Sequence, residues 1–236
     1  MLASQAVQLS PFLLSKNNSN EQTKATAILQ AKGVETPMKP DAFALTDAEK
    51  IERIQANVRD ILDTLGMDLT DDSLRGTPKR VAEMYVNELF NGLNPAEKPR
   101  MVTFENSYQY NKMLVEKNIS FHSACEHHLM PIIGKAHVGY VSSGRVIGLS
   151  KINRLVKYYA RRPQVQERMT LQILEDLKDV LNTDDVAVVI EAKHMCVIAR
   201  GVADEASSTV TTEFSGRFLE SDVQHRFLEF VRSDLM

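Results

Sequence analysis

The sequence predicts an α+β fold, with helices at both ends of the chain and an antiparallel sheet between them. Apolar residues recur at helical spacing from about residue 46, from about residue 77 and again near the C-terminus. In the middle of the chain they alternate with polar residues, which is typical of strands with one covered face. With 236 residues and 43% hydrophobic content, the chain can bury a substantial core as one domain with a helical appendage.

Residues 1–45 are expected to form a mobile N-terminal extension. They are rich in Ser, Asn, Gln and Lys and show no sustained apolar period. Too few basic residues precede the short apolar run at 12–14 for a secretory signal.

An N-terminal helical segment is predicted over residues 46–95. Thr46 and Glu49 have the spacing of a capping box at the start of an amphipathic helix. Gly66 is expected to end this first helix.

A second helix is expected to begin at Thr77 and Pro78, which supply a cap and a first-turn proline. Gly92 closes its apolar pattern. Arg80 lies in its first turn, and the pattern alone favours a solvated helix arginine.

The main domain is predicted over residues 96–236 and begins with two strands. Apolar residues alternate with polar ones from Met113 to Phe121 and from Ala136 to Tyr140. The turn at 125–128 should therefore join the two strands.

Two further helices are expected after the second strand. A short strand over 146–149 leads into Ser150, which is a good N-cap residue. Pro163 is expected to start the next helix, whose apolar face includes Met169 and Ile173.

The remainder of the chain should form three strands and a closing helix. The strands are expected over 186–191, in the segment around Cys196 and over 207–214. The last helix carries Val223 and Phe227.

Charge and cysteine content exclude several classes of function. A formal net charge of -3 provides no global basic field for nucleic acid or an anionic membrane, and no stretch is apolar enough for a membrane span. Two cysteines do not make a disulfide framework, and if both are metal ligands the protein needs a reducing compartment such as the cytoplasm.

The chemistry of the chain is predicted to centre on a metal site. Cys125 and His128 have the local spacing of zinc ligands, and Cys196 is the only other cysteine. Three protein ligands would leave one coordination position for water, which is the arrangement of a catalytic zinc. His127 or His194 as a fourth ligand would instead make the site closed and structural.

A basic cluster at a helix start indicates a phosphate site. Ser150, Lys151 and Arg154 surround the expected N-terminus of a helix, where free backbone N–H groups favour an anion. Arg200 follows Cys196 closely enough for a triphosphate to reach from this cluster toward the metal. The alternative is a solvated basic helix face. No glycine-rich nucleotide loop is present.

Gln166 and Glu167 form a polar pair near the start of the following helix. A carboxylate accepts two hydrogen bonds side by side, which suits the N–H and amino edge of guanine. Most glutamates in such a position are ordinary surface residues, so the pattern alone leaves both interpretations open.

Several strings together resemble the GTP cyclohydrolase I family, from about residue 46 to the C-terminus. The strings are CEHHLMPIIGKAHVGY, VIGLSKINRLVKYYARRPQVQER and HMCVIARGV, with a later Ser/Thr run that ends at GRF. The resemblance implies a zinc-dependent hydrolase that opens the imidazole ring of GTP, releases formate and forms 7,8-dihydroneopterin triphosphate, the first step of tetrahydrofolate biosynthesis.

The resemblance also implies a role for each matching residue. It makes Cys125, His128 and Cys196 the zinc ligands, and His127, His194 and Ser150 the groups that transfer protons. The residues that hold GTP would be Ser150, Lys151, Arg154 and Arg200 at the triphosphate, Gln166 and Glu167 at the guanine, and Arg80 as a further phosphate contact.

Family members adopt the tunnelling fold, in which sheets of several protomers close into a barrel. The resemblance therefore implies a cytoplasmic homodecamer with active sites shared between subunits.

Two other classes of function remain open at this point. One is a pterin- or purine-handling protein of the same fold without the cyclohydrolase step, although a zinc-free reductase would not need the paired cysteines. The other is a non-enzymatic binding module with a closed zinc site, which an assay of formate release would exclude.

Overall fold

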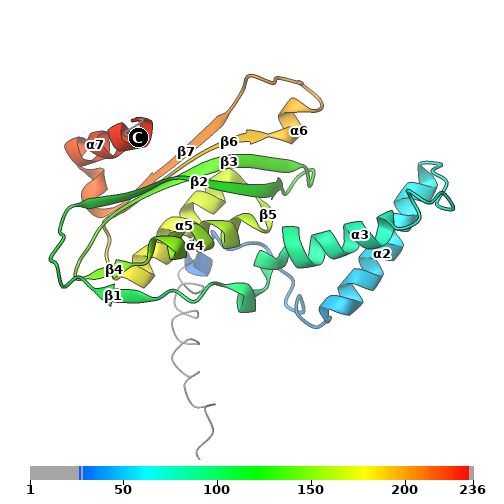
Figure 1. Ribbon diagram of the computed structural model, residues 1–236, viewed down its shortest axis with the longest axis horizontal. Coiled ribbons are helices and arrows are strands. Elements are labelled where there is room, and N and C mark those ends of the chain that lie inside the picture. Colours follow the sequence, from blue (N-terminus) through cyan, green and yellow to red (C-terminus); the bar gives the residue numbers. More distant parts are fainter. Residues whose placement is uncertain (1–26, 28, 234–236) are drawn as a thin grey trace, which may run out of the picture.

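The computed structural model describes residue 27 and residues 29–233. The α+β class is confirmed, because one mixed sheet carries helices on its faces and a helical hairpin at one end (Figure 1). In the described residues, no helix is both long and apolar enough to cross a membrane.

The main sheet has five strands in the order β5-β2-β3-β6-β7. Its long strands pair antiparallel and are β2 (Met113–Cys125), β3 (Pro131–Val141), β6 (Val186–His194) and β7 (Thr209–Phe214). The two predicted strands, β2 and β3, are confirmed, and the turn after Cys125 joins them, but β3 is buried on both faces from Ala136 to Val141 rather than on one. A second, two-stranded sheet pairs β1 (Thr103–Glu105) with β4 (Arg145–Ile147).

Pro163 does not start a helix, contrary to the sequence prediction. Pro163 and Gln164 form β5, which runs parallel to the end of β2 and pairs Gln164 with Cys125. The Gln164 side chain is buried and donates hydrogen bonds to Tyr159 O and Gln172 Oε1, both at 2.8 Å. These bonds and the pairing with β2 hold the segment extended, so the helix begins only at Gln166.

Two helices cover one face of the sheet and form the main core. These are α4 (Leu149–Ala160) and α5 (Gln166–Leu181), and fully buried side chains such as Leu155 and Ile173 line the contact. Because neighbouring strand residues point to opposite faces, Val188 enters this core while Val189 faces the other side.

On the opposite face, a smaller core packs beneath α7 (Ser221–Arg232), as predicted for the closing helix. Phe218 and Phe227 meet edge to face with ring centroids 5.5 Å apart. Their rings approach the sheet at Gly139, where a Cβ atom would lie 2.8 Å from the Phe227 ring. Only a glycine therefore allows this close approach.

The N-terminal helices form a hairpin that projects from one end of the sheet (Figure 1). The first, α2 (Asp47–Thr64), begins with the predicted capping box between Thr46 and Glu49. The second, α3 (Thr77–Met84), has Gly76 rather than Thr77 as its cap and is shorter than expected. It continues as a π-helix, η2 (Tyr85–Leu89), and two short 3-10 turns, η3 (Asn91–Leu93) and η4 (Pro95–Glu97).

The described part of the N-terminal segment contacts the core, which differs from the extension expected up to residue 45. Leu29 is 2% exposed and belongs to the main core. Gln172 Nε2 donates to Val34 O at 2.8 Å, and Arg162 Nη1 donates to Thr36 Oγ1 at 3.1 Å. Residues 29–36 therefore lie across α5 and the end of α4.

Candidate active site

The three predicted metal ligands come together at one end of the sheet. Cys125 ends β2, His128 lies in the following turn, and Cys196 lies in α6 (Met195–Ile198). Their ligand atoms all lie within 4.8 Å of one another. Sheet register explains the approach, because Ala124 pairs with Pro131 while Ile132 pairs with His194, two residues before Cys196.

The turn that carries His128 is held closed by backbone hydrogen bonds. Cys125 N donates to Met130 O and Leu129 N donates to Cys125 O, both at 2.8 Å. Leu129 takes a left-handed backbone conformation with φ of 52°, which is unfavourable for a residue with a branched side chain. The surrounding bonds enforce this conformation, and it directs the chain back into β3.

The segment around Cys196 is a helical turn, so the predicted strand is wrong there. β6 ends at His194, and the backbone becomes helical from Met195. Arg200 lies two residues beyond the end of this turn, and its Nη1 is 2.9 Å from His128 Nε2.

The donor set fits a zinc ion. Zinc prefers thiolate and imidazole ligands, with Zn–S bonds of about 2.3 Å and Zn–N bonds of about 2.0 Å. A tetrahedral site therefore needs the three donors slightly closer than the 4.8 Å limit that encloses them. Burial raises the pKa of the Cys196 thiol, and a hydrogen bond to Cys125 acts in the same direction. A bound cation would reverse this preference, because a coordinating thiol is deprotonated.

The two remaining predicted histidines lie beside this group. His127 is exposed, with Nδ1 3.8 Å from Cys125 Sγ. His194 is half-buried, and its Nε2 lies 2.8 Å from Gln166 Oε1. Burial lowers the pKa of His194, while the negative charge of Glu167 opposes that shift. Each of the two histidines therefore has a ring nitrogen within contact distance of a residue of the candidate site.

Gln166 and Glu167 occupy the first turn of α5 at the same end of the sheet but differ in exposure. Gln166 is 3% exposed, and its side chain is hydrogen-bonded within the protein. Glu167 is exposed and within electrostatic range of His194. Glu167 is therefore the member of the pair that is open to a ligand.

Two residues next to this site carry an ion pair that sequence reasoning missed. Arg168 and Glu126 are in direct contact, with side chains 10% and 31% exposed. Glu126 N also donates to Gln164 O at 3.0 Å. These contacts attach the ligand turn to β5 and α5. A carboxylate next to Cys125 and an arginine next to Glu167 were the only sequence signals for them.

The predicted phosphate cradle is at the other end of the sheet. Ser150, Lys151 and Arg154 lie in the first two turns of α4. Just before this helix, Ile147 N donates to Tyr140 OH, and Tyr140 pairs with Leu114 of β2. From there to the metal group the strands run for about ten residues, or on the order of 30 Å. Figure 1 shows β4 and the start of α4 at the end of the sheet opposite α6.

Ser150 is not the N-cap of α4, which corrects the sequence prediction. Gly148 is the cap, with extended backbone and no side-chain cap bond. The pairing of β4 with β1 ends at Ile147, so the chain turns into the helix immediately afterwards. Ser150 is exposed in the first turn, where its hydroxyl and the free backbone N–H groups face outward.

Arg80 lies neither with the metal ligands nor with the basic residues at the start of α4. Its guanidinium donates to Ser73 O at 3.0 Å and to Thr77 Oγ1 at 2.7 Å, within the hairpin of α2 and α3.

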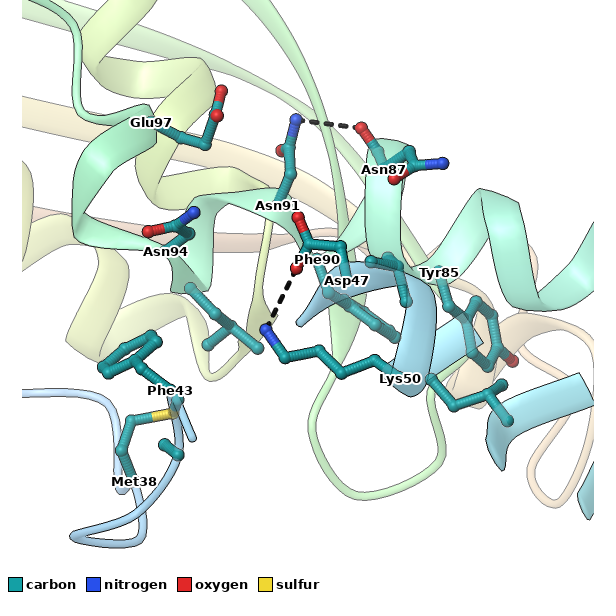
Figure 2. A pocket seen from close by; sticks show the side chains of 14 residues that line it. Met38, Phe43, Asp47, Lys50, Tyr85, Asn87, Phe90, Asn91, Asn94 and Glu97 are labelled. Atoms are coloured by element: carbon teal, nitrogen blue, oxygen red, sulfur yellow. Dashed lines mark hydrogen bonds and ion pairs between the residues drawn. The ribbon is translucent and has the colours of Figure 1, made fainter. Parts of the chain in front are cut away.

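A pocket near the N-terminal helices contains none of the predicted site residues. It has a volume of about 290 Å³ and an apolar lining that includes Met38, Phe43 and Phe90. Figure 2 shows its polar rim, where Lys50 pairs with Asp47. The pocket belongs to the packing of the N-terminal segment against the helices.

The fold and the Cys-His-Cys group together define an α+β protein with a potential three-ligand metal site beside two further histidines. Comparison with known families gives a narrower result. The model of the family described as GTP cyclohydrolase I matches residues 54–232. The chain belongs to the GTP cyclohydrolase I family.

Relatives with the name GTP cyclohydrolase 1 agree with this assignment. The chain is 59% identical to the protein of Flavobacterium johnsoniae over 204 residues, which covers 86% of this chain and 92% of the relative. It is 50% identical to the protein of Aeromonas salmonicida over 211 residues, or 89% and 96% of the two chains. It is 52% identical to that of Vibrio cholerae over 190 residues, or 80% and 87%.

Proposed function

We propose that this chain is a zinc-dependent GTP cyclohydrolase I that converts GTP to formate and 7,8-dihydroneopterin triphosphate. Membership of the family and the convergence of Cys125, His128 and Cys196 support this function. The convergence is the observation that carries most weight, because these residues come from separate elements and leave a coordination position for water.

Each predicted residue has a chemical task in this reaction. Zinc on the three ligands would lower the pKa of a bound water to about 7 and so supply hydroxide for attack on C8 of guanine. His127 and His194 lie beside that group and would transfer protons to and from the opening ring. Glu167 would accept two hydrogen bonds from the guanine edge. Gln166, the preceding residue of α5, would also contribute to holding the guanine.

The triphosphate would be held by cations and a helix N-terminus. Lys151, Arg154 and the first-turn N–H groups of α4 supply positive charge, and the Ser150 hydroxyl adds a donor. Arg200 lies beside the metal group and would hold the end of the triphosphate nearest to it. Arg80 would be a further phosphate contact, once its local hydrogen bonds are exchanged for the ligand.

We further propose that each site is completed by a neighbouring chain in a cytoplasmic homodecamer with the tunnelling fold. GTP is shorter than the distance of about 30 Å between the metal group and the start of α4, so one chain does not present both groups to one substrate. Within the described residues, β7 pairs on one side only and β2 contacts β5 only near its end, so both sheet edges are open for pairing.

The test of the function is formate release from GTP by the zinc-loaded protein. A burst or steady release of formate with a pterin product supports the proposal. Stoichiometric zinc without any release would instead support a closed, non-catalytic metal site. Size measurement by light scattering tests the assembly independently of activity.

A further inference from the structure

A second pocket lies between α4 and the short turns that follow the N-terminal hairpin. Its lining includes Arg154, Lys157 and Arg161 on one side and residues of the segment 91–99 on the other. The volume is about 260 Å³. Pockets that enclose a whole drug-sized ligand usually measure about 300–1,000 Å³. This pocket therefore has room for one end of a ligand rather than for a complete nucleotide.

The basic side chains of the pocket continue the exposed face of α4. Ser150, Arg154 and Lys157 are four and three positions apart on the helix, and Arg161 follows as its C-cap. Residues with this spacing lie on one face, and all four are exposed. The helix contains no acidic residue. The face therefore leads from the predicted phosphate residues at the start of α4 into the pocket.

The three cations of the pocket have no partner in the part of the chain that the structure describes, either as an ion pair or as a side-chain hydrogen bond. Neighbouring cations differ, since Lys98 pairs with Asp176 at 2.7 Å and Arg162 with Glu35 at 3.8 Å. One carboxylate, Glu97, belongs to the lining. The pocket is therefore positively charged in a chain whose formal net charge is -3, and such a recess attracts anions.

The wall opposite the basic side chains is fixed by the backbone. Gly92 N donates to Arg161 O at 2.9 Å. A Cβ atom at position 92 would overlap Tyr158 O and Arg161 O, so only glycine allows the chain to approach the helix this closely. Asn94 accepts from Ala96 N at 3.0 Å and holds the next turn. The shape of the pocket therefore does not depend on the three cationic side chains.

The terminal phosphate of a nucleotide suits this recess. It carries close to two negative charges at neutral pH, because its second pKa is about 6, and it has three acceptor oxygens. Arginine and lysine offer only donors, and the guanidinium stays charged at all relevant pH values.

We propose that Arg154, Lys157 and Arg161 bind the terminal phosphate of the nucleotide, so that this pocket is the part of the site that selects a triphosphate over a diphosphate. The inference rests on the proposed function, because it extends the phosphate site at the start of α4 by about two helical turns. It gives Lys157 and Arg161 a role that the family resemblance does not supply.

The first test removes these two charges and leaves Arg154 in place. In Lys157→Gln/Arg161→Gln, we expect KM for GTP to rise about 10-fold, the low end for hydrogen bonds to charged groups, because both side chains are exposed. The value of kcat should stay within about 2-fold, since uniform binding is lost. GDP has no third phosphate, so its inhibition constant should change by less than about 2-fold. Each single variant should show part of the loss for GTP.

Two results of these kinetics would overturn the proposal. Equal weakening of GTP and GDP would mean that the pocket does not distinguish the terminal phosphate. An unchanged KM for GTP would mean that the basic face is only solvated. The matched control is Arg226→Gln, because Arg226 is an exposed cation of α7 on the opposite face of the sheet. This variant should keep both constants within about 2-fold.

Calorimetry tests the pocket without turnover. Inorganic tripolyphosphate is titrated into the zinc-loaded protein, and the double variant should bind it about 10-fold more weakly than the unaltered protein. Orthophosphate is titrated in parallel. If the double variant loses orthophosphate binding but keeps its KM for GTP, the pocket holds a free anion and the proposal is overturned.

The two proposals fail in different measurements. Absence of formate release by the unaltered protein would overturn the proposed function. Equal affinity of the unaltered protein and the double variant for tripolyphosphate would overturn the phosphate pocket, whether or not formate is released.

Discussion

A buried ion pair between Lys98 and Asp176 should be the most sensitive electrostatic contact of the core. The Asp176 side chain is 0% exposed and that of Lys98 is 11% exposed, with Lys98 Nζ 2.7 Å from Asp176 Oδ2. Tyr159 OH donates to the same carboxylate at 2.9 Å. Lys98→Met keeps the apolar stem of the side chain but leaves the buried carboxylate with the tyrosine alone.

Breaking a buried pair by removal of one partner usually lowers stability by about 3–5 kcal/mol. Here we expect about 3 kcal/mol, at the lower end, because a second cation remains close. Arg162 is stacked over the Tyr159 ring at 4.8 Å and offsets part of the unpaired charge. Adding Asp176→Asn to Lys98→Met should recover much of the loss, since no buried charge is then unpaired.

The measurement is urea unfolding followed by circular dichroism at one fixed protein concentration, because assembly also contributes to stability. The control is Lys79→Met, whose pair with Glu83 spans 3.8 Å between side chains that are 66% and 46% exposed. Exposed pairs contribute about 1 kcal/mol or less. If Lys98→Met unfolds at the same urea concentration as Lys79→Met, the carboxylate of Asp176 is not an isolated buried charge and the reasoning fails.

Three further outcomes are expected. Cys196→Ala should abolish zinc binding, measured by mass spectrometry, and with it formate release; full activity without zinc would contradict the metal assignment. Glu167→Ala should weaken GTP binding by about 1.5–3 kcal/mol and reduce the preference for GTP over ATP in calorimetry, whereas Lys151→Ala should weaken both nucleotides alike. Burial, reinforced by Lys135 and Lys117 and opposed by Glu191, lowers the pKa of His137 in the folded state. As pH falls, the unfolded chain therefore takes up a proton on His137 before the folded protein does. The contribution of neutral His137 to stability is full above pH about 6.5 and is lost as pH falls through the folded pKa. In His137→Gln, the urea midpoint of unfolding should therefore fall less between pH 7 and pH 5.

Sequence reasoning was reliable where the deciding interaction is local. The capping box of Thr46 and Glu49 involves residues three apart, and the structure contains both of its bonds. The alternation over 113–141 likewise depends only on neighbouring positions, and it located β2, β3 and the turn between them correctly.

The errors occurred where a distant partner decides the conformation. Ser150 has the chemistry of a cap, but the pairing of β4 with β1 ends two residues before the helix and makes Gly148 the cap instead. Proline is common at the start of helices, but Pro163 pairs with Ala124 of β2 and is therefore part of a strand. The residues around Cys196 are apolar enough for a strand. In the folded chain they form a helical turn beside the turn that carries His128, which their local sequence does not indicate.

The candidate site shows the same division. The ligand types, the short spacing of Cys125 and His128, and Cys196 as the only other cysteine were visible in the sequence, and the resemblance implied the same three ligands. The contact between His194 and Gln166 was not visible, because the two residues are 28 positions apart and meet only in the folded chain. No local pattern marks a glutamine as the partner of a distant histidine.

The distance between the metal group and the start of α4 also has a genetic consequence. With a site completed by two chains, a Cys196→Ala chain and a Lys151→Ala chain are defective in different halves. In a mixed oligomer of the proposed kind, some sites would receive the intact half of each chain, so two inactive alleles expressed in one cell would restore activity that neither has alone. A single defective allele would conversely impair sites on its neighbours, so that it is partly dominant over an intact copy.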